Sequence, residues 1–176
     1  MQALKNRLPD PGVSDLELEP LRRVSLFADI HGNEEALREL AGAITHATYA
    51  PGETIVREND AGSEMFILVQ GAASVYRHTT EGELYRVTIL KGEENAFFGE
   101  GALLDSDSRS ATIRADVECV CLILEREAFA NFGKRHPAWA YPVLVRIARA
   151  VMARLRKTNQ DLTLVYNALV SEIRGQ

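Results

Sequence analysis

The hydrophobic period of the chain changes between residues 45 and 124, and this change constrains the fold more than any other feature. Short runs rich in Val, Ile, Thr and aromatic residues alternate there with turn residues, and glycines stand at the breaks: Gly52, Gly62, Gly71, Gly82 and Gly92. The period within the runs is two, which is typical of strands. About eight such runs without helices between them predict an antiparallel sandwich, barrel or jelly roll and disfavour a Rossmann-type fold.

The segments on either side return to helical spacing. Residues 15–30 and 33–44 place apolar residues three and four apart, with Asn33 as the expected N-cap of the second segment, after a loose leader over residues 1–12. Beyond the strands we expect a short helix that closes at Gly133, and then a long helix with Pro142 in its first turn. The predicted parts are a leader with short helices (1–44), a β domain (45–124) and C-terminal helices (125–174).

The long C-terminal helix carries a heptad seam. Its members follow one another at alternating spacings of four and three: Leu144, Ala148, Val151, Leu155, Thr158, Leu162, Val165 and Leu169. A seam this narrow suits pairing with a second copy, so we predict a homodimer through this helix. The alternative is that the first half of the helix packs on the β domain and only the second half is exposed. The two interpretations are compatible, because one helix presents several faces.

Charge and composition narrow the class of protein. The chain has 20 Lys+Arg and 25 Asp+Glu, a formal charge of -5, made up of -11 over residues 1–129, +7 over 130–160 and -1 over 161–176. No apolar run approaches the ~18 residues of a membrane helix and the N-terminus has no hydrophobic signal core, so we expect a cytoplasmic protein without a membrane segment. Cys119 and Cys121 share one face of one predicted strand, and we expect reduced core residues rather than a disulfide.

The segment FGEGALLDSDSRSAT, residues 98–112, combines the groups that a sugar phosphate needs. Gly99 permits a tight turn, and Glu100 offers two acceptor oxygens to a ribose hydroxyl. Arg109 offers a planar fork of five donors to a phosphate, beside the Ser110 hydroxyl. The small residues Gly101 and Ala102 leave backbone N–H groups approachable, and a helical turn over GALL would add the positive end of its dipole.

This composite pattern resembles the phosphate-binding cassette of the cyclic nucleotide-binding domain family. The matching residues are Phe98, Gly99, Glu100, Ala102, Leu103, Leu104, Arg109, Ser110, Ala111 and Thr112. The likeness extends in order and spacing from about residue 26 to residue 162, and the last segment is similar to bacterial members of the type of the catabolite activator protein. The chain departs from the family pattern at Ser108, where a proline is frequent, and at Gly101, where Leu or Ile is frequent.

The resemblance implies a mainly β fold with flanking α-helices: an eight-stranded antiparallel jelly roll, short N-terminal helices and a long C-terminal dimer helix. It also implies that the protein is a sensor of cAMP or cGMP that signals by rearranging that helix, with no enzymatic activity and no further cofactor. Glu100 would accept from the ribose 2′-hydroxyl and Arg109 would pair with the cyclic phosphate. N–H groups near Gly99, Glu100, Gly101 and Ala102 and the Ser110 hydroxyl would complete the cradle.

The purine would meet a second group of residues. The resemblance places Arg154, Thr158 and Asn159 of the long helix near the base, with a contact across the dimer as one option, and Val87 offers an apolar contact from the strand before the cassette. The choice between cAMP and cGMP stays open, as do the downstream protein partner and whether the dimer depends on ligand.

Two other classes of function are alternatives to the sensor. The first is a transcription-regulator-like protein that acts with DNA or with a DNA-bound partner, and the second is a metal-dependent enzyme. Direct DNA binding is disfavoured, because residues 161–176 read as one helical continuation rather than a helix-turn-helix, and because the chain is acidic overall. A metal-dependent jelly-roll enzyme would need clustered His and carboxylate ligands. The four histidines are instead scattered along the sequence: His31, His46, His78 and His136.

Overall fold

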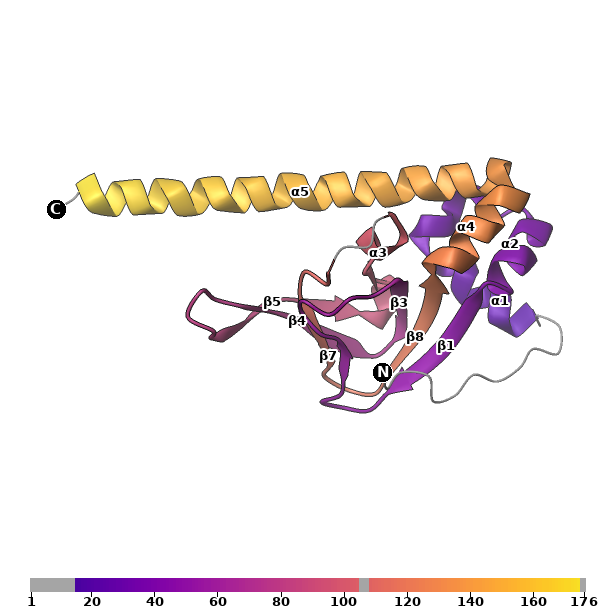
Figure 1. The fold of residues 1–176 in the computed structure, drawn as a ribbon, viewed down its shortest axis with the longest axis horizontal. Coiled ribbons are helices and arrows are strands. Elements are labelled where there is room, and N and C mark those ends of the chain that lie inside the picture. The colour runs from indigo at the N-terminus through magenta and orange to yellow at the C-terminus, as the bar shows by residue number, and fades with distance from the viewer. Residues whose placement is uncertain (1–14, 105–107, 175–176) are drawn as a thin grey trace.

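Two four-stranded antiparallel sheets form the body of the protein in a computed structural model that describes residues 15–104 and 108–174 (Figure 1). The sheet orders are β1-β8-β3-β6 and β2-β7-β4-β5. The strands are β1 (Ile44–Tyr49), β2 (Thr54–Val56), β3 (Glu64–Gln70), β4 (Ala72–His78), β5 (Leu84–Lys91), β6 (Phe97–Phe98), β7 (Thr112–Ala115) and β8 (Cys119–Glu125). The predicted eight-stranded jelly roll is confirmed. The predicted leader, residues 1–12, lies outside the described residues.

Alternation along β3 and β8 divides the core into two layers. Phe66 of β3 and Cys121 and Ile123 of β8 pack between the two sheets, while Ile67 and Leu122 face the helices on the other side. Both strands are therefore buried on both faces, which explains why their sequences read as continuous apolar runs. Both cysteines are free and buried in the layer between the sheets, as predicted from their spacing.

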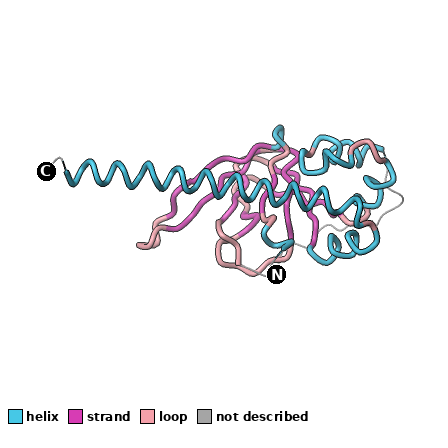
Figure 2. The backbone as a smooth tube through the Cα atoms, turned by 90° about the horizontal axis from the view of Figure 1, so that it is seen from above, coloured by secondary structure: helices cyan, strands magenta, loops and turns pink. Residues whose placement is uncertain are grey.

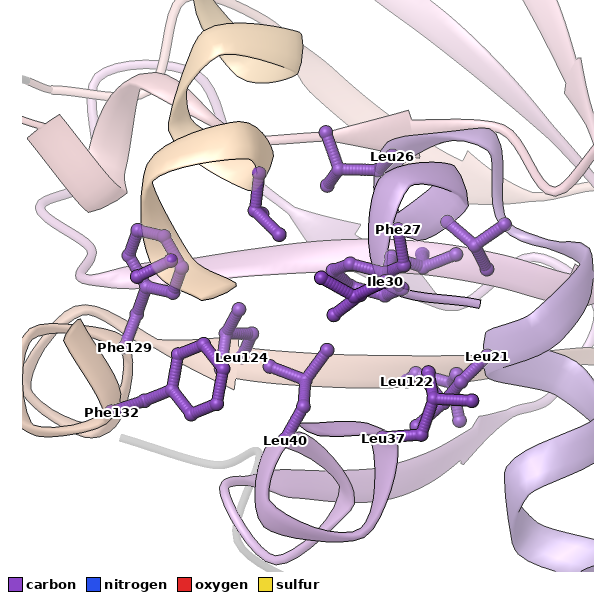
Figure 3. Packing of buried hydrophobic residues seen from close by; sticks show 14 of the residues in the cluster. Leu21, Leu26, Phe27, Ile30, Leu37, Leu40, Leu122, Leu124, Phe129 and Phe132 are labelled. Atoms are coloured by element: carbon purple, nitrogen blue, oxygen red, sulfur yellow. The ribbon is translucent and has the colours of Figure 1, made fainter. Parts of the chain in front are cut away.

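The second layer of the core lies between the β1-β8-β3-β6 sheet and the helices. Those helices are α1 (Asp15–Arg23), η1 (Ser25–Ile30), α2 (Glu34–Ala41), α4 (Arg126–Arg135) and the first part of α5 (Pro137–Arg174). Figure 3 shows Phe27, Leu40 and Phe132 of three of these helices converging with Leu124 of β8. Asn33 caps α2 as expected, since its side-chain Oδ1 accepts from the Ala36 N–H at 3.0 Å.

The structure corrects the predicted end of the first C-terminal helix and the predicted start of the second. Gly133 does not close α4, because the helix continues to Arg135. A Cβ at Gly133 would make an ordinary van der Waals contact with the Ala140 Cβ of α5, at 3.5 Å. The break falls at His136 and Pro137 begins α5, so Pro142 is an interior residue of that helix rather than a first-turn residue. Pro142 has no N–H to donate to the carbonyl four residues before it.

Helix α5 starts on the body and then leaves it. Ala140, Val143 and Ile147 are buried against the N-terminal helices and α4, whereas every residue from 151 to 169 is exposed. The helix continues well past the sheets (Figure 1), and the β4–β5 hairpin extends in the same direction, to one side of the helix when seen from above (Figure 2). The short helix α3 (Gly101–Leu104) follows β6 and lies on the side of the body that faces α5 (Figure 1).

Candidate ligand-binding site

A left-handed residue turns the chain from β6 into α3. Gly99 has φ +72, a conformation that side chains with a Cβ rarely adopt. A Cβ at this position would also lie 2.7 Å from Arg109 Nη1 and 2.9 Å from the Glu64 carbonyl oxygen. The glycine is thus required twice, by the backbone angle and by the guanidinium that packs on it.

Arg109 is the buried cation of the cassette, with 8% of the residue exposed. Its Nη1 donates to the Glu64 backbone carbonyl at 2.7 Å, and its Nη2 donates to the Glu64 carboxylate at 2.7 Å. The guanidinium also lies over the Phe66 ring, 5.6 Å from its centroid. Burial lowers the pKa of Arg109, and the nearby Glu64 carboxylate opposes that shift. Two of the five guanidinium donors are committed to Glu64.

The turn between β2 and β3 fixes the backbone of Arg109. The Arg109 N–H donates to the Asp60 carbonyl at 2.9 Å, and the Asn59 N–H donates to the Arg109 carbonyl at 2.8 Å. Gly62, in the same turn, has no Cβ where one would collide with the guanidinium. The arginine is therefore held at both its main chain and its side chain before any ligand arrives.

Glu100 is the buried anion of the cassette, with 6% of the residue exposed. Its carboxylate oxygen Oε1 accepts from Arg154 Nη1 of α5. The Arg154 Nη2 donates to the Phe97 carbonyl at 2.6 Å, and the guanidinium lies over the Phe97 ring, 5.1 Å from its centroid. Arg154 therefore ties the projecting helix to the cassette.

The other cassette residues hold the turn in place. Gly101 is exposed at the start of α3, and the Ala102 N–H donates to the Gly99 carbonyl at 3.0 Å, so that one of the predicted cradle N–H groups is already engaged. The Ala102 carbonyl accepts from Arg126 Nε of α4 at 2.5 Å. Ser110 is exposed beside the arginine. Residues 105–107 of the predicted cassette, 98–112, lie outside the described residues.

The residues predicted to meet a purine are exposed in this structure. The Thr158 hydroxyl donates to the Arg154 carbonyl at 3.0 Å, and the Asn159 carbonyl accepts from the Thr163 hydroxyl at 2.9 Å, both within α5. Val87 lies at a bulge of β5, because Thr88 pairs with Val75 and Arg86 with Tyr76, and it is 51% exposed. Arg154 contacts a carboxylate and a carbonyl here, while the base contacts remain predictions.

The sequence analysis did not identify several residues that contact the site residues. Glu64, the counter-ion of Arg109, lies 45 residues before it, and only the pairing of β3 with β6 and β8 brings it to the cassette. Phe66 and Phe97, whose rings lie against the Arg109 and Arg154 guanidinium groups, are not among the predicted site residues. A carboxylate immediately after a glycine-containing turn was the available signal for Glu64, but it matches many surface turns equally well.

The described residues limit what other chemistry this part of the protein offers. Across residues 15–104 and 108–174, no three His, Cys, Asp or Glu side chains gather closely enough to hold a metal ion. None of the helices in this part of the chain combines the length and the hydropathy of a membrane span. The cassette holds a buried carboxylate, Glu100, and a buried guanidinium, Arg109. A carboxylate is complementary to hydroxyl groups and a guanidinium to an anion.

A jelly roll with this cassette is the architecture of a regulatory ligand-binding domain. The chain belongs to the cyclic nucleotide-binding domain family, whose sequence pattern matches residues 46–136. This membership confirms the resemblance drawn from the cassette.

Similar proteins include kinases and their regulatory subunits. The chain is 36% identical over 110 residues to human cGMP-dependent protein kinase 2, which covers 62% of this chain and 14% of the kinase. It is 32% identical over 111 residues to the cAMP-dependent protein kinase regulatory subunit of Blastocladiella emersonii, which covers 63% of this chain and 27% of that subunit. The chain thus spans only a small part of the length of these relatives.

Solved structures with the same fold include bacterial regulators. The N-terminal domain of a transcriptional regulator from Streptomyces coelicolor A3(2) is 29% identical with a TM-score of 0.66, and the match covers 81% of this chain and 94% of that one. The catabolite activator protein of Thermus thermophilus is 26% identical with a TM-score of 0.67, covering 77% and 62%. A cyclic nucleotide-binding domain from Methylobacillus flagellatus, 18% identical with a TM-score of 0.72 over 86% and 85%, shares the fold.

Proposed function

We propose that this protein is a sensor of cAMP or cGMP that reports ligand binding through α5. The observation that carries the proposal is the pair of buried, opposite charges in one cassette, Glu100 and Arg109, each held by a partner from another element. Burying a charge is costly unless it serves a bound partner or a paired neighbour. A cyclic phosphate and a ribose hydroxyl supply matching partners for the donors and acceptors that remain.

The phosphate side of the site is preorganised. Glu64 occupies two donors of Arg109, and its own side chain is 38% exposed, so that it is free to adjust when a phosphate approaches. Three further donors of the guanidinium, the backbone N–H groups at Gly99, Glu100 and Gly101 and the Ser110 hydroxyl would then surround the phosphate oxygens. Charge-assisted hydrogen bonds of this kind are roughly twice as strong as neutral ones.

Titration calorimetry with cAMP and with cGMP, side by side, tests the binding proposal. We expect saturable heat with at least one nucleotide at micromolar or tighter affinity. Arg109→Ala should weaken binding by about 30-fold or more, which corresponds to about 2 kcal/mol, because it removes the charge that faces the phosphate. Arg114→Ala is the matched control, because Arg114 is exposed on β7 and lies over Tyr76 rather than in the cassette. Equal binding by the Arg109 variant would place the pocket elsewhere.

Arg154 supports the proposed output through α5. It bonds one carboxylate oxygen of Glu100, and the ribose hydroxyl would bond the other, so ligand and helix share one buried group. A ligand shifts a conformational equilibrium only through contacts that differ between the states. The Glu100 carboxylate supplies such a contact. A ribose hydroxyl bonded to one carboxylate oxygen would fix the orientation of the other oxygen, which accepts from Arg154.

The heptad seam supports a homodimer through α5. Leu155, Leu162 and Leu169 of the seam are at least 50% exposed in the single chain, although they are large apolar residues. In a parallel pair, Ala148, Leu155, Leu162 and Leu169 occupy the a positions, and Leu144, Val151, Thr158 and Val165 occupy the d positions. Thr158 would then lie in the seam beside the cassette, where it would meet the base together with Val87.

In a parallel pair, Asn159 of each helix would lie beside the other helix. In this heptad Arg154 occupies a g position and Asn159 an e position, and a g residue lies beside the e residue of the other helix five positions on. Asn159 of the partner subunit would thus lie next to Arg154, which contacts Glu100 of the cassette. The proposed purine contact of Asn159 is therefore made across the dimer.

A second candidate function is transcriptional regulation with DNA or with a DNA-bound partner. The Streptomyces coelicolor regulator domain, to which 81% of this chain is similar, favours it. Fluorescence anisotropy with duplex DNA at several salt concentrations distinguishes the two. Binding that is stimulated by cyclic nucleotide would support the regulator, and no binding at low salt would leave the protein-partner sensor as the better account.

A further inference from the structure

Glu58 is a carboxylate that lies between the cassette and strand β4. It follows β2 by two residues, where the chain turns toward β3, and only 10% of its side chain is exposed. Enclosing a charge in the protein is costly unless the charge has partners. The partners of Glu58 therefore indicate what the carboxylate holds together.

The side chain of Glu58 is bound to the end of β4. Its Oε2 accepts from the His78 main-chain N–H at 3.1 Å and lies 2.8 Å from the His78 ring nitrogen Nδ1. Its Oε1 lies 3.6 Å from Arg77 Nε. His78 is the last residue of β4, so the carboxylate fastens the segment after β2 to the β4–β5 hairpin, next to the turn of that hairpin.

The main chain of the same segment is bound to the second half of the cassette. The Glu58 N–H donates to the Thr112 hydroxyl at 3.0 Å. The next two residues hold Arg109, because the Asn59 N–H donates to the Arg109 carbonyl at 2.8 Å and the Asp60 carbonyl accepts from the Arg109 N–H at 2.9 Å. Glu58 thus joins the hairpin to the segment that holds Arg109.

This segment takes an unusual backbone conformation at Asn59. The φ angle of Asn59 is +68, in the left-handed region that residues other than glycine rarely adopt, although asparagine does so more often than most. Such a conformation persists where the surrounding contacts determine it. The Glu58 carboxylate supplies contacts on one side of Asn59, and the pairing of Ala61 with Ser108 supplies them on the other. Removal of the carboxylate would release one of the two sides.

We infer that Glu58 is a positioning residue for Arg109, which acts by fixing the segment that holds the Arg109 main chain. The inference rests on the proposed nucleotide site, since Arg109 is the group that would pair with the phosphate. Strand β4, to which the carboxylate is bound, pairs with β5, and β5 carries Val87, the residue proposed to meet the purine. Glu58 thereby sets the position of the phosphate side of the site relative to the base side.

Hydrogen exchange of the ligand-free protein, followed by NMR, tests the positioning without nucleotide. In Glu58→Ala the Arg109 N–H should exchange roughly tenfold faster, because bonds to a charged group are lost. The N–H of Leu122, in the core strand β8, should keep its wild-type rate. Glu58→Gln should restore the Arg109 rate, since a carboxamide oxygen can accept both bonds from His78. An unchanged Arg109 rate in Glu58→Ala, or equal acceleration at Arg109 and Leu122, would overturn the inference.

Calorimetry of a double-mutant cycle tests the effect on the ligand, with whichever of cAMP and cGMP binds the wild-type protein more tightly. Glu58→Ala should weaken binding by about fivefold, and in the Arg109→Ala background it should change the affinity by less than about twofold, because Glu58 acts through Arg109. Glu53→Ala is the matched control, since Glu53 directly precedes β2 and accepts from the Ala50 N–H at 2.9 Å. Wild-type affinity in Glu58→Ala, or an equal loss in both backgrounds, would overturn the inference.

The two experiments separate this inference from the proposed function. If neither nucleotide binds the wild-type protein, the proposed function fails, and the exchange rate of Arg109 still decides whether Glu58 positions it. If nucleotide binds and Glu58→Ala changes neither the affinity nor the exchange, the inference fails alone. Should Glu58→Ala not fold, His78→Ala replaces it, because it removes a ring that is 50% exposed. His78→Ala should accelerate the exchange of Arg109 by about twofold, and a wild-type rate would overturn the inference.

Discussion

The body buries most of its large apolar side chains, whereas the C-terminal half of α5 exposes them. In the body, Phe27 and Phe132 are completely buried, and among the described residues only the Tyr49 hydroxyl is a buried side-chain polar atom without a hydrogen-bond partner. In α5, Leu162 and Leu164 are both about two-thirds exposed. The core of the body is complete within one chain, whereas the helix carries an apolar heptad seam that the single chain leaves exposed. The difference indicates that the helix acts through contacts with another molecule.

One residue joins the two regions at the ligand site. Arg154 stands on the first exposed stretch of α5 and reaches back to Glu100 and Phe97. Nearer the start of the helix, Arg146 holds Asp29 of η1 with hydrogen bonds of 2.5 and 2.8 Å, which fixes the base of α5 on the body. The helix is thus anchored at one point and touches the cassette at another.

The largest effect on folding should come from truncating the core of the body. Phe132→Ala should cost about 3–5 kcal/mol of unfolding free energy, because it removes a fully buried ring and leaves a cavity. Leu164→Ala, on the exposed helix, should change it by no more than about 0.5 kcal/mol. Urea unfolding measures both. Similar losses would show that the exposed half of α5 packs as part of the body.

The dimer should respond to the seam and not to the opposite side of the same helix. Leu162→Lys should weaken the dimer by at least about 3 kcal/mol, since two leucines lose their burial in each pair. Leu164→Lys is the matched control, because its exposure is 67% against 66% for Leu162 and it lies outside the heptad seam. Light scattering gives the masses. A mass unchanged by the Leu162 variant would argue against the seam.

Breaking the contact between helix and cassette should have a smaller effect. Arg154→Gln should weaken nucleotide binding by about tenfold, or about 1.4 kcal/mol, because the Glu100 carboxylate loses the cation that orients it. Arg156→Gln removes a neighbouring exposed charge and should leave the affinity unchanged. Calorimetry measures both variants. Equal affinities would separate Arg154 from the site.

The smallest effect concerns pH. The hydrogen bond from the His78 side chain is the main cause that lowers the pKa of Glu58 below its ordinary value of 4.5, and the nearby Arg77 adds to it. A lowered pKa in the folded state gives stability that is present above pH 4.5 and is lost as the pH falls below it. Glu58→Gln should therefore flatten the loss of stability on acidification.

Urea unfolding above and below that pH supplies the measurement. Glu81→Gln, at the exposed tip of the hairpin, is the control and should keep the wild-type pH dependence. An unchanged slope in the Glu58 variant would mean that its bond to His78 forms equally in the unfolded chain.

The sequence predicts the strands well and the site only in part. The period of two identified all eight strands because alternation reflects which face of a strand is buried, and this is a local property. Glu100 and Arg109 were found because the cassette is contiguous. Glu64 was missed because its approach to Arg109 depends on the pairing of strands distant in sequence. The end of α4 was misplaced at Gly133. The helix runs on to Arg135, and the break falls at His136, because a residue that precedes a proline disfavours the helical conformation.

The coupling between the two regions is the central claim, and hydrogen exchange with and without saturating nucleotide tests it most directly. The account predicts slower exchange in the cassette and also in α5 around residues 154–165, because ligand on Glu100 secures Arg154 and strengthens the helix pair. In Arg154→Gln, at saturating ligand, the cassette should keep its protection and the helix should lose its response. Protection of the cassette alone in the wild-type protein would contradict the account.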